Sequence, residues 1–137
     1  MAALTITPSA IIKGTGANVS TGIAGASITA GQALYKDSAA SDVLKLADAN
    51  ASSATAACVG IALHAALTGQ PLQYQDGGVL AFGAILTVGE IYVLGATAGE
   101  INPVGDLASG WKTTILGIAS TTSNLTMRLY ASDITHS

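Results

Sequence analysis

Short runs of apolar residues, separated by glycine and small polar residues, follow one another along most of the chain. Several of these runs alternate apolar and polar side chains with a period of two, which is typical of a strand with one buried face. In the run at residues 125–130, Leu125, Met127 and Leu129 share one face, and the residues between them share the other. The pattern predicts strands at residues 29–35, 43–46, 57–63, 71–75, 79–82, 90–94, 100–102, 112–119 and 125–130.

Part of this pattern occurs twice. The sequence VGIAL at residues 59–63 returns as LGIAS at residues 116–120. Three pairs of residues keep a nearly constant spacing: Gly31 and Gly89 lie 58 positions apart, Asp48 and Asp106 lie 58 apart, and Gly60 and Gly117 lie 57 apart. The spacing predicts an internal duplication, with repeat units at residues 30–75 and 88–130 that share one strand order.

The stretches between the predicted strands contain turn and loop signals. The tripeptide Asp-Gly-Gly at residues 76–78 is typical of a tight turn between two strands. Residues 42–57 are rich in alanine and could form a helix that begins at Asp42. The corresponding residues 101–112 contain one proline and two glycines, which are costly inside a helix. We therefore expect a turn at residues 76–78, and a strand followed by a loop in each of the other stretches.

The repeated glycines, Gly31, Gly60, Gly89 and Gly117, are expected to maintain the shape of the fold. A glycine within a strand usually marks a bulge, a bend or a close approach of two backbones. Valine at Gly60 or Gly117 is therefore expected to destabilise the protein. Together the patterns predict an all-β fold, a small β-barrel or sandwich built from two related halves at residues 28–137.

Residues 1–27 differ in composition from the duplicated part. They are rich in glycine, alanine, serine and threonine, and their few large apolar side chains gain little burial energy. They are expected to form an extended N-terminal arm that becomes ordered against a neighbouring subunit or another partner, with Ile6, Ile11, Ile12 and Lys13 as the contacts. A protein that begins at residue 28 is expected to stay folded.

The composition indicates that much of the surface faces other protein. Half of the residues are apolar and only 9% are charged, whereas about 25% is usual in soluble domains. An exposed apolar surface commonly marks an interface, so we expect a homo-oligomer. The five basic residues are scattered and form no stripe, which argues against binding of nucleic acid.

The sequence predicts no catalytic or cofactor site. It lacks a Gly-x-Ser-x-Gly elbow and the spacing of a calcium loop, and its two histidines and single cysteine cannot make a metal site unaided. Cys58 lies in an apolar run and is expected to be buried. The first residues do not resemble a secretory signal, and no apolar stretch approaches the roughly 20 residues of a spanning helix, so we expect a soluble protein made in the cytoplasm.

Three segments resemble small proteins of tailed bacteriophages that are encoded near the major capsid protein and are regarded as head decoration, or cement, proteins. The segments are ITAGQALYKDSAASDVLKLADA, VGIALHAALTGQPLQYQDGG and LTVGEIYVLGATAGEINPVGDLASGWKTTILGIAS, and the resemblance covers residues 28–130. It implies a β-rich virion protein that binds the major capsid protein on the outer surface of the head, often as a trimer, without catalytic residues.

Two other functions remain open on the sequence alone. One is a tail or head-fibre component of the virion, which would share the composition. The other is a β-sandwich carbohydrate-binding module or small enzyme. Carbohydrate platforms usually present several exposed aromatic side chains, and this chain has only six aromatic residues.

Overall fold

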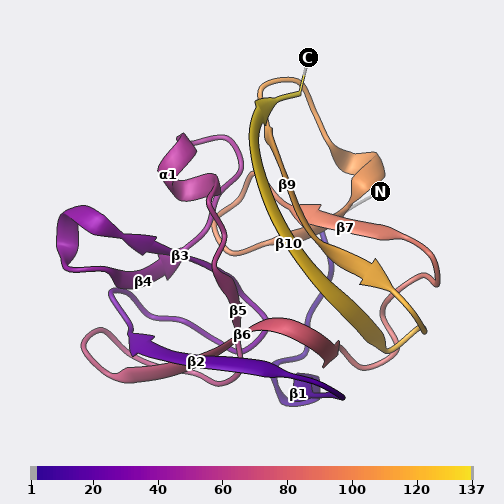
Figure 1. The fold of residues 1–137 in the computed structure, drawn as a ribbon, viewed down its shortest axis with the longest axis horizontal. Coiled ribbons are helices and arrows are strands. Elements are labelled where there is room, and N and C mark those ends of the chain that lie inside the picture. Colours follow the sequence, from indigo (N-terminus) through magenta and orange to yellow (C-terminus); the bar gives the residue numbers. More distant parts are fainter. Residues whose placement is uncertain (1–2, 137) are drawn as a thin grey trace.

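A computed structural model describes residues 3–136, which are built almost entirely from strands joined in one curled sheet (Figure 1). All pairs of neighbouring strands are antiparallel, so the predicted all-β class is confirmed. The elements are η1 (Pro8–Ala10), β1 (Ile12–Lys13), β2 (Asn18–Ile23), β3 (Ala33–Asp37), η2 (Ser38–Ala40), β4 (Val43–Leu46), α1 (Ser53–Ala56), β5 (Gly60–Ala62), β6 (Pro71–Ala81), β7 (Ile91–Leu94), β8 (Ile101–Pro103), η3 (Val104–Asp106), β9 (Lys112–Ala119) and β10 (Asn124–Thr135).

The strand order shows the duplication directly. The sheet runs β4-β3-β5-β6-β10-β9-β7-β8, so the first half has the order β4-β3-β5-β6 and the second half has the matching order β8-β7-β9-β10. The two halves meet where β6 pairs with β10. Gly60 lies opposite Leu34 on β3, and Gly117 lies opposite Tyr92 at the equivalent place on β7. The prediction of two halves with one strand order is confirmed.

Strand β6 belongs to both halves. Its first part pairs with β2 and β5, and its second part pairs with β1 and β10. The predicted turn at residues 76–78 is wrong, because the strand bends there and continues. Gly78 has a φ of +79°, which glycine adopts without steric cost. The side-chain amide of Gln75 donates to the carbonyls of Gly77 (2.9 Å) and Val79 (2.8 Å), so it holds the bend from one side.

Residues 18–27 form part of the first half and do not belong to an unpacked arm. Strand β2 pairs with β6 at Gln75, just as the second part of β6 pairs with β10 at the equivalent residue Thr126. Ala24 and Ile28 are buried in the interior of the first half. Small side chains do not prevent strand pairing, because the backbone supplies the hydrogen bonds. The predicted boundary at residue 27 is therefore wrong, and the first repeat begins near residue 18.

Residues 3–14 close the second half. In the first half the chain after β2 reaches β4 directly, where the Gly25 N–H donates to the Leu44 carbonyl (2.7 Å). In the second half the equivalent carbonyl, that of Ile101 on β8, accepts from the Leu4 N–H (2.9 Å). Strand β1 covers the outer edge of β6, and Ile11 is buried in the main core. Residues 1–2 of the predicted arm lie outside the described residues.

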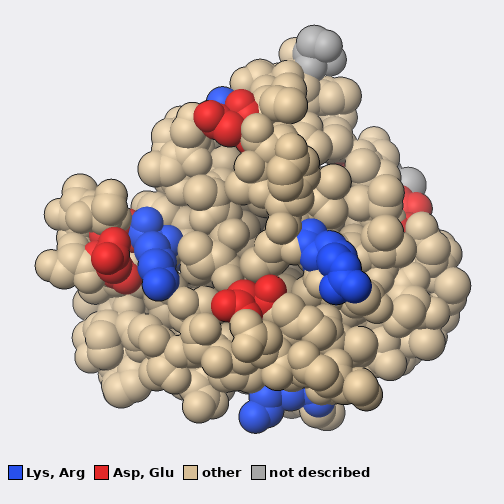
Figure 2. Space-filling view, viewed as in Figure 1, with Lys and Arg blue, Asp and Glu red and all other residues tan. Residues whose placement is uncertain are grey.

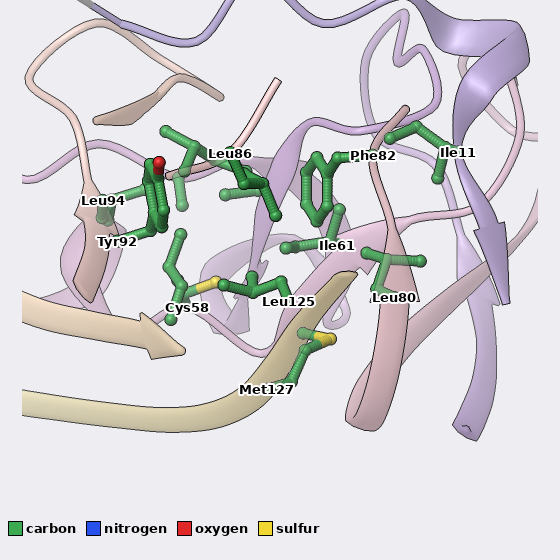
Figure 3. Packing of buried hydrophobic residues seen from close by; sticks show 14 of the residues in the cluster. Ile11, Cys58, Ile61, Leu80, Phe82, Leu86, Tyr92, Leu94, Leu125 and Met127 are labelled. Carbon is green, nitrogen blue, oxygen red and sulfur yellow. The ribbon is translucent and has the colours of Figure 1, made fainter. Parts of the chain in front are cut away.

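Two apolar clusters fill the fold. The larger one lies between the halves and includes Phe82, Tyr92, Leu125 and Met127 (Figure 3). The smaller one lies inside the first half, around residues such as Leu72. A large share of the buried residues are alanines, so the backbones approach closely and small changes of volume should be felt.

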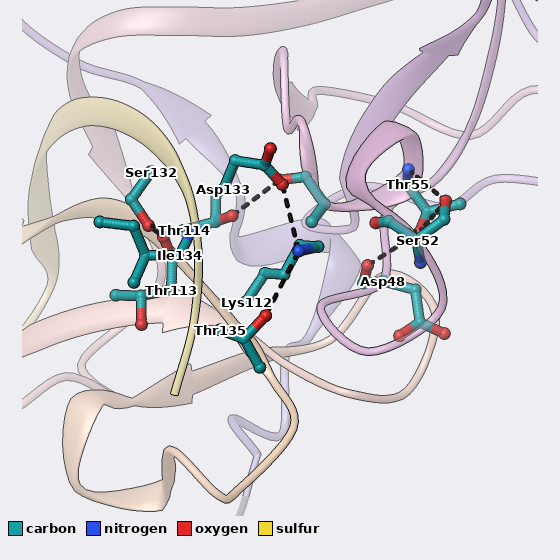
Figure 4. Close-up of polar contacts among 11 residues, drawn as sticks. Asp48, Ser52, Thr55, Lys112, Thr113, Thr114, Ser132, Asp133, Ile134 and Thr135 are labelled. Atoms are coloured by element: carbon teal, nitrogen blue, oxygen red, sulfur yellow. Dashed lines mark hydrogen bonds and ion pairs between the residues drawn. The ribbon is translucent and has the colours of Figure 1, made fainter. Parts of the chain in front are cut away.

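The Ala-rich stretch at residues 42–57 contains strand β4, a loop and a single turn of helix, α1. The side chains of Ser52 and Thr55 cap this turn reciprocally, since each accepts from the backbone N–H of the other (Figure 4). The Thr114 hydroxyl donates to the Ala56 carbonyl (2.7 Å) and attaches α1 to β9. The prediction of a strand and a loop in place of a long helix is confirmed, with this one helical turn added.

Cys58 should be unreactive while the protein is folded. It is buried, as predicted, and desolvation raises the pKa of its thiol to about 11. At pH 8 the thiol therefore stays protonated, and the thiolate is the reactive form. An aromatic disulfide reagent should label Cys58 only after denaturation, measured by absorbance of the released thiolate. Rapid stoichiometric labelling of the native protein would contradict this burial.

Candidate interaction surface

The four residues predicted to contact a partner separate into two groups. Ile11 is buried and Ile6 packs against the same core, so both side chains are occupied within the chain itself. Ile12 is 61% exposed, and Lys13 beside it is also exposed. Only Ile12 and Lys13 remain available for contact with another molecule.

The four predicted glycines have structural roles in the two halves. Gly31 and Gly89 both have positive φ angles, and their N–H groups donate to equivalent carbonyls, those of Ala62 and Ala119, at 2.8 Å in both cases. Gly60 and Gly117 are points of close backbone approach, to be considered further below. These glycines therefore shape the fold and do not form a binding site.

One face of the second half is apolar and accessible. Leu80 on β6 and Leu125 on β10 point into the core, so the residues on either side of them point outward. Ile118 on β9 lies opposite Thr126 on one side and Ile91 on the other, which continues the outward row across three strands. We name as the outer face the residues Ile12, Val79, Ala81, Ile91, Ile118, Asn124 and Thr126.

The outer face carries no charged side chain. Arg128 lies next to it along β10, and Lys13 follows Ile12 on β1. Figure 2 shows charged groups as isolated spots on a surface that is otherwise uncharged. Within the outer face, Ile12 and Ile118 are 61% and 45% exposed. Apolar side chains gathered on one sheet face are typical of a surface that packs against another protein.

The chemistry available elsewhere is limited. No three metal-ligating side chains lie together among residues 3–136. His64 accepts from the Gln73 N–H through Nε2 (3.1 Å) at the end of β5, which is a structural role. Asp48 accepts from the Asn50 N–H (3.0 Å) in a turn, and Asp106 accepts from the Asn102 amide (2.9 Å). These contacts agree with the turn roles that the repeat indicates for the two aspartates.

Aromatic side chains are mostly inside the protein. Phe82, Tyr74 and Tyr92 are buried, and Tyr35 and Trp111 are half-buried. Within the described part of the chain, Tyr130 is the single exposed aromatic residue, at 60%. Stacking of a sugar ring usually needs a platform of such residues, and none is present on the outer face.

Comparison with known proteins gives no relative. No protein-family model, no curated protein and no solved structure matches this chain. In the part of the chain that the structure describes, none of the helices has the length and apolar character needed to cross a bilayer.

The outer face could be found only in part from the sequence. The alternation at residues 125–130 does place Thr126 and Arg128 on the face opposite Leu125. The register that brings Ile118, Thr126 and Val79 into one row depends on pairing between distant strands. The alternation within a single strand does not specify that register.

Proposed function

We propose that this protein is a structural component of a bacteriophage virion, which binds the outer surface of the head and stabilises it. The partner is the major capsid protein, and the protein acts without an enzymatic step or a cofactor. It is made in the cytoplasm of the host bacterium and forms a homo-oligomer, for which the sequence resemblance favours a trimer. The resemblance of residues 28–130 to head decoration proteins supports this function.

The observation that carries the proposal is the uncharged outer face. Its side chains come from strands held in a fixed register by the ladder, so the surface is preformed and little entropy is lost on binding. Burial of apolar area contributes about 25 cal/mol per Å². A flat β surface repeated many times on a capsid can therefore stabilise the shell without any reactive group.

A tail or head-fibre component is the second candidate, because it would use the same kind of surface at another place on the particle. Labelling of the protein in intact virions, followed by electron microscopy, separates the two locations. A carbohydrate-binding module is less well supported, because Tyr130 is the single exposed aromatic side chain among residues 3–136.

A lysine at Ile118 should weaken binding to heads. The side chain is 45% exposed at the centre of the outer face, so Ile118→Lys places an unpaired charge in the interface while the fold stays intact. We expect affinity for purified heads that lack the protein to fall about tenfold or more, measured by co-sedimentation.

Leu67→Lys is the matched control. Leu67 is 62% exposed and lies in the loop before β6, away from the outer face. We expect this variant to bind heads as the parent does. Equal binding by both variants and the parent would show that the outer face is not the contact, and failure of the parent to bind heads would overturn the proposed function.

A further inference from the structure

Five residues of β10 form a free strand edge. Up to Met127, β10 is paired with β6 on one side and β9 on the other. Beyond Met127 it remains paired with β9, where Tyr130 lies opposite Ile115. Along residues 128–132 the opposite edge has no neighbouring strand in the part of the chain that the structure describes. Figure 1 shows the β9–β10 ribbon continuing beyond the rest of the sheet toward the C-terminus.

The free edge ends at a fixed bend. Asp133 has a φ of +57°, and its carboxylate contacts the Lys112 ammonium (3.2 Å; Figure 4). The Ser132 hydroxyl donates to the Thr113 carbonyl (2.5 Å) and accepts from the Ile134 N–H (3.1 Å). These contacts turn the chain away after residue 132. The edge is therefore bounded by β6 at one end and by the bend at the other, with Tyr130 at its centre.

This edge lacks the usual protection against pairing. Exposed edge strands commonly carry lysine, proline or an inward-pointing charge, which discourage the addition of another strand. Residues 128–132 contain neither lysine nor proline, and Tyr130 at their centre is 60% exposed. Arg128 is also exposed, and the one side-chain hydrogen bond of its guanidinium goes to the Met127 carbonyl.

We propose that residues 128–132 pair antiparallel with the same residues of a second copy of this chain, about a two-fold axis at Tyr130. In this register Tyr130 lies opposite its counterpart, and Arg128 lies opposite Ser132 of the second copy. Facing residues then point to the same side of the joined sheet, so the outward and inward faces remain continuous. Arg128 also lies diagonally next to the second tyrosine, at a distance that suits a cation–π contact.

The occupant follows from the edge itself. A segment of five residues that is closed at both ends fits a partner segment of the same length, and the two-fold register uses every residue of both. The chain already joins its own halves by antiparallel pairing of β6 with β10. A second copy repeats that pairing one step further along β10. This inference does not depend on binding to the head, and it predicts a dimer where the sequence resemblance favours a trimer.

The first test is the mass of the purified full chain. Sedimentation equilibrium should give a dimer, twice the chain mass of 13.5 kDa. Tyr130→Lys places two like charges opposite each other at the axis and removes the aromatic pair, so the dissociation constant should rise about tenfold or more. Ile134→Lys, on the same strand beyond the bend, should leave it unchanged. A monomeric or trimeric parent, or equal effects of the two variants, would overturn the proposal.

The second test fixes the register. Facing residues of antiparallel strands have Cα atoms about 4.5–5.5 Å apart, within the range of a disulfide. Tyr130→Cys should therefore form a covalent dimer under mild oxidation, whereas Ile134→Cys, which is similarly exposed at 65%, should not. Equal cross-linking of both variants would indicate random collision. Loss of head binding by Tyr130→Lys from a monomeric parent would instead assign the edge to a capsid strand.

Discussion

A protein that lacks residues 1–27 should not reach the folded state. Its deletion removes β2, which pairs with β6 at six positions, and leaves the first part of β6 as an open edge. It also removes Ala24 from the smaller core and Ile11 from the larger one. Domains of this kind are stable by about 5–15 kcal/mol, and the loss of a central strand neighbour together with parts of both cores exceeds that margin. Circular dichroism and thermal melting should show an unfolded or aggregated chain.

Single substitutions give the same test without deletion. Ile11→Ala removes a side chain that is 7% exposed and should lower the free energy of unfolding by about 2–4 kcal/mol. Ile12→Ala, its neighbour at 61% exposure, should change it by less than about 0.5 kcal/mol. Similar stabilities for these two variants, or a cooperative melt of the truncated protein, would mean that residues 1–27 are dispensable for folding.

The sequence predicted most of the strands and the duplication, because both depend on local signals. Alternation of apolar residues marks a strand, and a repeated glycine at a constant spacing marks equivalent places in two halves. The role of residues 18–23 was missed for a physical reason: Val19, Ser20 and Thr21 bury little apolar area and are held by backbone hydrogen bonds to β6. Burial of large side chains is the signal that sequence patterns carry, and backbone pairing leaves almost none.

The bend at Gly78 was missed for a related reason. Asp-Gly-Gly is favourable both in a hairpin turn and in a strand that bends sharply, since glycine tolerates positive φ in either case. The choice is made by distant contacts. Ala17 and Gly16 lie against Gly78, and the Gln75 amide bridges the bend. The outer face and the free edge of β10 depend on the same long-range register, so neither could be derived from the sequence alone.

Alanine at Gly60 or Gly117 should destabilise the protein strongly, and valine more so. A Cβ at Gly60 would lie 2.7 Å from the Gln75 carbonyl oxygen, and a Cβ at Gly117 would contact the equivalent oxygen, that of Thr126. Both oxygens belong to the backbone of a strand paired on both sides, so they cannot move without breaking the ladder. We expect a loss of about 2–3 kcal/mol for alanine at either position, near the upper end of the usual cost of overpacking.

Gly77→Ala is the matched control, since Gly77 also lies within a strand. A Cβ there would meet only the Asn18 Cβ at 3.5 Å, an ordinary van der Waals distance. Denaturant titration of the three variants should therefore show two large shifts of the midpoint and one small one. Because Gly60 and Gly117 hold equivalent positions, their two shifts should also be similar in size. Three equal shifts would attribute the effect to the backbone entropy of glycine, and a large shift at only one repeated glycine would mean that the two halves do not share this close approach.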